Sequence, residues 1–170
     1  MAASRPIQFF RRMGGTGVAP VRSGKYKTGE AIVKGSPLLI DANGELTLHG
    51  GATGAEVSGI ALEAAGTRPG YDAANSPLVV TGRKQEISYI PADTETEFSI
   101  QISADATTIG TVTQTLIGEE YGFIIDAGGS GFWFLDTTET TTKIFEVVDI
   151  DLDLNVAIVR FMRTAIDPGL

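Results

Sequence analysis

The sequence predicts an all-β protein, built either as a compact β-barrel or sandwich or as two small β lobes, and preceded by an extended N-terminal arm. Three observations support this fold class. Short apolar segments recur at turn-like intervals, with Gly, Asn, Asp or Pro between them. Residues 98–102 alternate apolar and polar side chains with the period of a half-buried strand. No stretch carries a long amphipathic helical pattern.

The boundary between arm and body is expected after residue 27. Residues 1–28 hold six basic residues and no acidic one, whereas the rest of the chain holds seven basic and all 21 acidic residues. Glycines at 14, 15 and 17, followed by Pro20, interrupt this start, which shows no sustained helical or strand period. We therefore expect residues 1–27 to form a basic arm that does not fold alone, and residues 28–170 to form one β body.

The first half of the body predicts a series of short strands separated by turns. The expected strand segments are residues 30–35, 36–41, 45–50, 56–65, 78–82 and 85–91. Asn43-Gly44 predicts a tight hairpin turn of a primed type, because such turns need positive φ. Gly59 lies inside an apolar segment and indicates a bulge or a close backbone contact. Residues 67–77 are polar and are expected to form a loop.

The second half continues this pattern. Its expected strand segments are residues 96–103, 120–127, 131–136, 143–154 and 155–163. The Thr-rich stretch 104–118 between the first two has room for one short helical turn. Trp133 is expected in the core, since one face of its strand must be buried.

Few residues carry chemistry that an enzyme needs. The chain has no Cys and one His, His49, which we expect to face solvent in a loop next to Gly50. Asp149, Asp151 and Asp153 alternate with apolar residues, which predicts an exposed acidic strand face over a buried one. Leu154 and Arg160 stand where an EF-hand needs Gly and Glu.

The residues therefore predict no catalytic, cofactor-binding or metal site, and no enzyme activity. A cation site at the three aspartates stays as the weaker alternative. The stretch 17–25 lacks the spacing of a phosphate-binding loop, and no expected strand precedes it.

The stretch from Ile7 to Arg12 is the most suggestive part of the arm. Phe9 and Phe10 are large apolar groups in a basic segment, and two interpretations stay open. They pack on the chain's own body, or they anchor the arm in a partner's apolar pocket with Arg11 and Arg12 at its rim. The residues expected to contact a partner are Ile7, Phe9, Phe10, Arg11, Arg12 and Arg22. Nucleic acid and anionic membranes are not expected partners, because the body is strongly acidic.

The stretch 28–65 resembles the capsid decoration, or cement, proteins of tailed bacteriophages. The shared pattern is a pair of strands, a turn and an Ala-x-Val-x-Gly-Ile-Ala strand. It is carried by Gly29, Ile32, Gly35, Pro37, Asp41, Gly44, Ala55, Val57, Gly59, Ile60 and Ala61. Segments in residues 98–161 are similar to the second half of such domains, so the resemblance covers about residues 28–163 and leaves out the arm.

This resemblance implies a structural virion protein without cofactors. It implies a β-rich homotrimer on the capsid exterior, made in the host cytoplasm, that bridges neighbouring copies of the major capsid protein. A receptor-binding or tail-fibre module is the alternative function. The sequence shows no repetitive shaft and few aromatic residues for a carbohydrate-binding tip, which favours the capsid protein.

Overall fold

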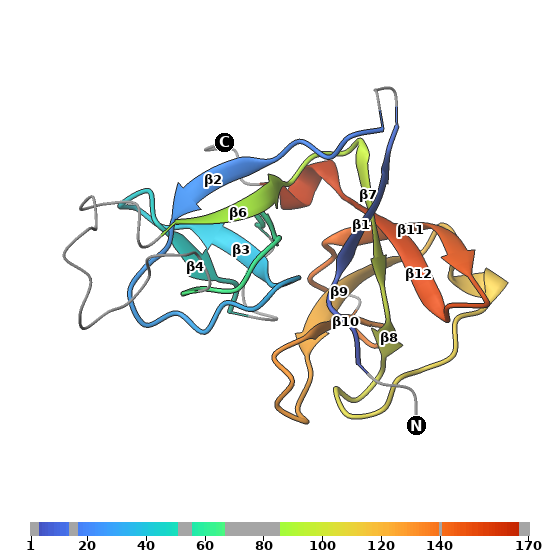
Figure 1. Ribbon diagram of the computed structural model, residues 1–170. Coiled ribbons are helices and arrows are strands. Elements are labelled where there is room, and N and C mark those ends of the chain that lie inside the picture. The colour runs from blue at the N-terminus through green and yellow to red at the C-terminus, as the bar shows by residue number, and fades with distance from the viewer. Residues whose placement is uncertain (1–3, 14–16, 51–55, 67–85, 140, 167–170) are drawn as a thin grey trace.

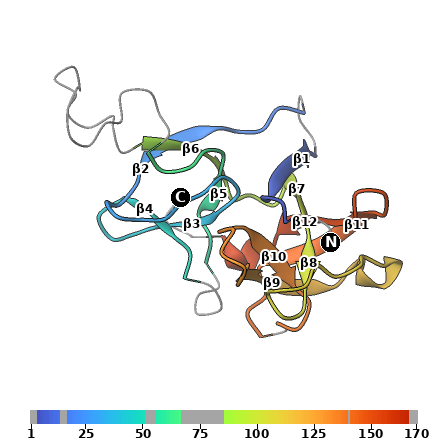
Figure 2. The same cartoon turned by 60° about the horizontal axis from the view of Figure 1, so that its bottom comes forward.

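The computed structural model describes residues 4–13, 17–50, 56–66, 86–139 and 141–166. Its described elements are β-strands and two short 3₁₀ turns, so the all-β prediction is confirmed. The strands form two sheets that lie side by side as two lobes (Figures 1 and 2). The predicted loop 67–77 and the predicted strand 78–82 lie outside the described residues.

The five-stranded sheet has the strand order β2-β6-β5-β3-β4. Its strands are β2 (Arg22–Lys25), β3 (Pro37–Ile40), β4 (Leu46–Leu48), β5 (Gly59–Ala61) and β6 (Glu86–Pro91). All hydrogen-bonded neighbours are antiparallel, and a parallel bridge from Tyr26 to Leu46 brings the two edges together. Residues 30–35, which we predicted as a strand, are irregular, although Ile32 is buried in the core of this sheet.

The hairpin predicted at Asn43-Gly44 joins β3 to β4, but its turn is not of the primed type. Only Gly44 has positive φ (+76°), and its N–H donates to the Asp41 carbonyl at 2.9 Å. A type I turn followed by a left-handed glycine therefore connects the strands. The Asp41 carboxylate accepts bonds from the N–H groups of Glu45 (3.0 Å) and Asn43 (2.8 Å). These bonds, that of Glu45 first, lower the pKa of Asp41 below its ordinary value.

Gly59 is a point of close backbone approach, as the sequence predicted. A Cβ at Gly59 would lie 2.3 Å from the carbonyl oxygen of Ile90 and 2.7 Å from Cδ2 of Tyr89. Both neighbours belong to β6, with which β5 pairs. The missing side chain is therefore what lets β5 and β6 meet at this position.

The seven-stranded sheet has the order β1-β7-β12-β11-β9-β10-β8. Its strands are β1 (Gln8–Arg12), β7 (Thr96–Ile100), β8 (Ile102–Ser103), β9 (Glu120–Ile125), β10 (Trp133–Asp136), β11 (Phe145–Asp151) and β12 (Val156–Phe161). The chain passes from β7 to β8 through Gln101 alone. Because β8 pairs with the far strand β10, the sheet curls back on itself.

The described part of the first 27 residues is tied into both sheets and does not form a separate arm, which differs from the boundary predicted after residue 27. Strand β1 pairs with β7 in one sheet, and β2 pairs with β6 in the other. Because β6 and β7 follow each other along the chain, the segment that holds β1 and β2 runs antiparallel beside the segment that holds β6 and β7, across both lobes (Figure 1). We call residues 7–13 and 17–25 the N-terminal strap.

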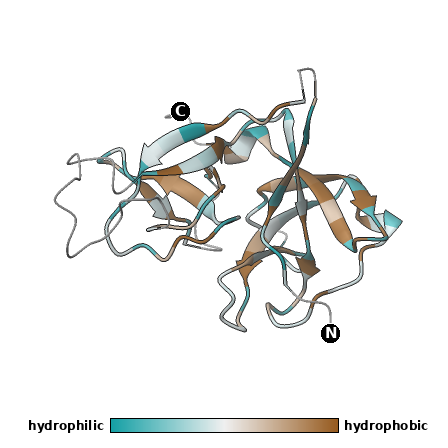
Figure 3. Cartoon of the chain, in the orientation of Figure 1, coloured by the Kyte–Doolittle hydropathy of each residue, from teal (hydrophilic) through white to brown (hydrophobic). Residues whose placement is uncertain are grey.

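One apolar core crosses the boundary between the two sheets. It joins Val57, Ile60 and Ile90 from the five-stranded side to the side chains of the seven-stranded sheet, Phe98 and Phe145 among them. Figure 3 shows apolar residues along the strands of both sheets. A further backbone link runs from the Val57 N–H to the carbonyl of Ala165, at 2.7 Å. The two lobes therefore share an apolar core, next to the separate cluster around Ile32 in the five-stranded lobe.

His49 is part of this junction, so the prediction that it faces solvent is wrong. The side chain is 2% exposed. It meets the ring of Phe123 edge-on at 4.6 Å between centroids, and that of Trp133 at 6.5 Å. Trp133 is itself 2% exposed, as predicted for a core residue. The end of β4 is thus fixed against β9 and β10 by aromatic packing.

The β11–β12 connection departs from the predicted alternating strand. Strand β11 ends at Asp151, and the chain turns before Val156. Leu152 and Leu154, expected on a buried face, are therefore 62% and 53% exposed. A register shift between Val147 and Asp149 also breaks the alternation inside β11.

Replacing Gly59 by Ala should destabilise the fold, because the new methyl group meets a backbone carbonyl that cannot rotate away. We expect a loss of about 1–3 kcal/mol in the free energy of unfolding, measured by urea denaturation. Gly110→Ala is the matched control, since its Cβ would face the movable side chain of Ile102 at 3.0 Å. Equal losses in the two variants would contradict this account of Gly59.

Candidate functional site

Some of the residues predicted to contact a partner lie in the interior, and others lie on the surface. Ile7 is 2% exposed in the shared core, and Phe9 packs against that core from a partly buried position. Phe10 lies where the register between β1 and β7 shifts, and its side chain is 43% exposed. Of the two interpretations of the phenylalanines, packing on the body therefore holds for Phe9, while Phe10 faces solvent.

The two arginines of β1 pair with carboxylates of the same chain. Arg11 donates from Nε to Glu97 at 2.6 Å, and its guanidinium lies 5.4 Å from the centre of the Phe10 ring. Arg12 contacts Glu95 at 3.2 Å and Asp93 at 3.8 Å. Much of the positive charge that we expected to face a partner is therefore neutralised by carboxylates of the same chain.

These contacts belong to a row of charged residues on one face of the seven-stranded sheet. In the strand register, Arg11 stands opposite Glu97, and Glu97 stands opposite Arg160. Arg160 in turn stands opposite Glu146, to which it donates from Nε at 2.9 Å and Nη2 at 2.8 Å. Positive and negative side chains thus alternate across β1, β7, β12 and β11. Cross-strand pairs of opposite charge stabilise this register.

A shallow hollow of about 350 Å³ is lined by all four residues of this charged row. Its apolar lining includes Met13 from the strap, Ile117 from the turn before β9, and Val148 from β11. Met13 and Ile117 are 49% and 45% exposed. Arg11 also lines the hollow, and its side chain is 54% exposed. We call this feature the β1 hollow.

The exposed apolar residues of the described surface are concentrated in the strap. Four of the eight large ones lie within residues 10–21, namely Phe10, Met13, Val18 and Val21. Arg22, at the start of β2, is exposed next to Val21. Phe10 and Arg22 were predicted from the sequence, whereas Met13, Val18 and Val21 were not. The sequence did indicate that these three side chains are exposed, because the segment around them is rich in polar residues and offers few apolar neighbours to bury them.

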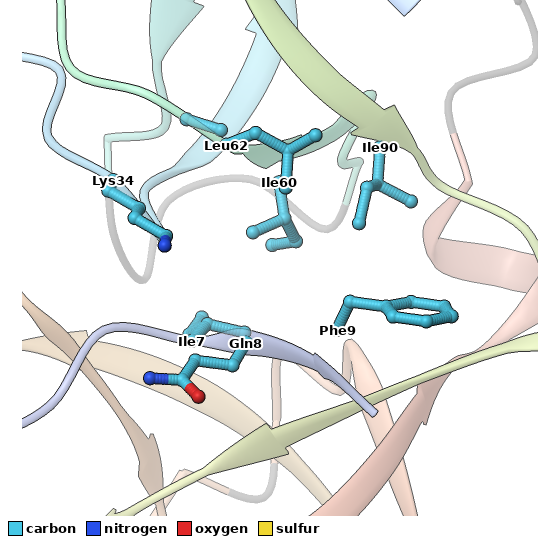
Figure 4. Close-up of a pocket in the computed structure, with 8 residues that line it drawn as sticks. Ile7, Gln8, Phe9, Lys34, Ile60, Leu62 and Ile90 are labelled. Atoms are coloured by element: carbon cyan, nitrogen blue, oxygen red, sulfur yellow. The ribbon is translucent and has the colours of Figure 1, made fainter. Parts of the chain in front are cut away.

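A second cavity, of about 260 Å³, lies on the inner side of β1, between the two lobes (Figure 4). Ile60 and Ile90 approach it from β5 and β6, with Leu62 just after β5, and Phe9 approaches from β1, with Ile7 just before that strand. The polar side chains on its lining are Gln8 and Lys34. The rest of the lining is apolar, and Lys34 is the one ionisable side chain in it.

No chemical site emerges elsewhere in the described part of the chain. Within these residues, no group of three or more His, Asp or Glu side chains is placed to hold a metal ion. Asp149 and Asp151 instead accept backbone N–H bonds from Ile150 and Leu154. No described helix is long and apolar enough to cross a membrane. Comparison with known proteins finds no matching family model and no matching curated relative.

Removing the ion pair of Arg11 should lower the free energy of unfolding more than removing the ion pair of Arg12. Glu97 is 1% exposed, so Arg11→Met leaves a buried carboxylate without its cation, and we expect a loss of about 1–3 kcal/mol. Arg12→Met is the matched control, because its partner Glu95 is 59% exposed and such pairs contribute less than about 1 kcal/mol. Urea denaturation of both variants measures the difference. Equal effects would show that burial of Glu97 is not what makes the Arg11 pair important.

Proposed function

We propose that this chain is a structural protein of a tailed-phage virion, which binds the exterior of the capsid and bridges neighbouring major capsid subunits. The proposal rests on the sequence resemblance and on one structural observation. That observation is the concentration of exposed apolar residues in the strap. A group of such residues on a folded surface is typical of a protein–protein contact.

The contact surface of this proposal is narrower than the one predicted from the sequence. Ile7 and Phe9 are committed to the interior, and Arg12 pairs with acids of its own chain. The side chains that remain for the capsid are Phe10, Met13, Val18, Val21 and Arg22. Apolar residues with a cation beside them are a common composition for the centre and rim of an interface.

The way the strap is held also favours a binding role. Its two strands are hydrogen-bonded to β7 and β6, so the sheets carry Phe10 in β1 and Arg22 in β2, with Val21 next to the latter. A surface that is ordered before binding loses little conformational entropy when the partner arrives. We propose, on the resemblance, that the protein binds the capsid as a homotrimer.

The double variant Phe10→Ser, Val21→Ser should bind capsids at least tenfold more weakly than the parent, because two apolar contacts of about 1.5–3 kcal/mol each are lost. The measurement is co-sedimentation with emptied capsids of the same phage. Ile125→Ser is the matched control, since Ile125 is 41% exposed on β9, outside the strap.

All three proteins should melt within a few degrees of one another, because both sites are exposed. Equal capsid binding by the double variant and the parent would show that the strap is not the contact. Failure of the parent to bind would overturn the proposed function.

A further inference from the structure

The turn between β3 and β4 carries an Asn-Gly pair, in which the asparagine side chain is open to attack by the backbone of the chain itself. Asn43 and Gly44 are both exposed. Gly44 has no side chain to shield its backbone nitrogen, and a Cβ built at this position would meet no atom within 4 Å. The surroundings of the turn therefore put no steric obstacle in the way of a reaction between the two residues.

This reaction needs only the two residues and water. The Gly44 nitrogen gives up its proton to solvent and attacks Cγ of Asn43. The new N–Cγ bond closes a succinimide ring while the Cγ–Nδ2 bond breaks, and Nδ2 takes up a proton and leaves as ammonia. Water then opens the ring at either of its carbonyl groups. Residue 43 ends as an aspartyl or an isoaspartyl residue, each with a negative charge that the asparagine lacked.

The folded turn holds the attacking nitrogen. The Gly44 N–H donates to the Asp41 carbonyl at 2.9 Å, and this bond must open before the proton can leave. The Asp41 carboxylate accepts the N–H groups on either side of Gly44, from Asn43 at 2.8 Å and from Glu45 at 3.0 Å. Asp41 therefore fixes the backbone on both sides of the reactive nitrogen.

We propose that Asn43 is a site of spontaneous deamidation that the folded turn keeps closed, and that Asp41 is the residue that holds it closed. The two residues react only in molecules whose β3–β4 hairpin has opened locally. Because ammonia is lost to solvent, each reaction is a permanent record of such an opening. The reaction belongs to this turn alone and does not depend on binding to a capsid.

The isoaspartyl product should not fit the turn in which it forms. Its main chain runs through Cβ, which adds an extra backbone atom between the two strands, and its new carboxylate lies beside those of Asp41 and Glu45. The turn leads into β4, where the bridge from Leu46 to Tyr26 joins the two edges of the five-stranded sheet. Deamidation should therefore weaken the closure of this sheet.

Peptide mass spectrometry of the full chain, incubated at mildly alkaline pH, tests the proposal. The native chain should deamidate at Asn43 at least tenfold more slowly than the chain unfolded in guanidinium chloride. Asp41→Ala removes both carboxylate bonds and should raise the native rate at least threefold, whereas Asp41→Asn keeps an oxygen acceptor and should stay near the parent rate. Asn155 is the internal control, because the branched side chain of Val156 follows it and should keep its rate low in every sample.

Hydrogen exchange at the Gly44 amide provides an independent measurement on the unmodified parent. The native rate of deamidation, relative to the unfolded rate, should match the fraction of time for which this amide is open. The separated isoaspartyl form should melt at a lower temperature than the parent.

Four results would overturn the proposal. The first is an Asn43 that stays intact in the unfolded chain, and the second is equal rates in the native and unfolded chains. The third is a folded Asp41→Ala variant that reacts as slowly as the parent. The fourth is deamidation faster than the opening of the Gly44 amide allows, which decides the matter even where Asp41→Ala does not fold.

Discussion

The pairing of the N-terminal strap with β6 and β7 is the interaction on which the rest of the structure depends. A single chain crossing, from β6 to β7, would by itself leave the two sheets free to hinge. The strap runs antiparallel beside this crossing and hydrogen-bonds to both sheets. It also sends Ile7 into the shared core, where it packs with residues of both lobes. Two adjacent segments resist bending and twisting better than one, so the lobes are held in one arrangement.

The uneven distribution of charge in the sequence follows from the same arrangement. The basic residues of the first 28 positions do not form a free cationic arm, because several pair with acidic residues of the sheets they join. Arg11 pairs with Glu97, Arg12 with Glu95, and Lys25 with Glu45. The buried Glu97 requires such a partner, since an unpaired carboxylate is costly in the interior. Several basic residues of the strap thus pair with acidic residues of the sheets, and its exposed side chains include both apolar residues and Arg22.

Local features of the sequence predicted the fold well, and distant contacts were missed. The β3–β4 hairpin, the close approach at Gly59 and the burial of Trp133 were predictable because turn chemistry and strand alternation act over a few residues. The pairing of the strap was not predictable. The register shift at Phe10 breaks the alternation of β1, and the strands that pair with the strap lie more than 60 residues away in the sequence. His49 was missed for the same reason, since the rings that bury it come from β9 and β10. At the candidate site, Phe10 and Arg22 were identified from composition, whereas Met13 and Ile117 meet only in the folded chain.

The joining of the two lobes by the strap is the feature on which the other conclusions depend. Urea unfolding of a chain that begins at Thr28, compared with the full chain, tests it most directly, with Trp133 fluorescence as the probe of the junction. Loss of the Ile7 and Phe9 contacts alone removes about 1.5–3 kcal/mol for each side chain that was buried. We expect the shortened chain to unfold at a much lower urea concentration, with a free energy of unfolding at least about 3 kcal/mol smaller, or not to fold. An unchanged midpoint and slope would contradict it.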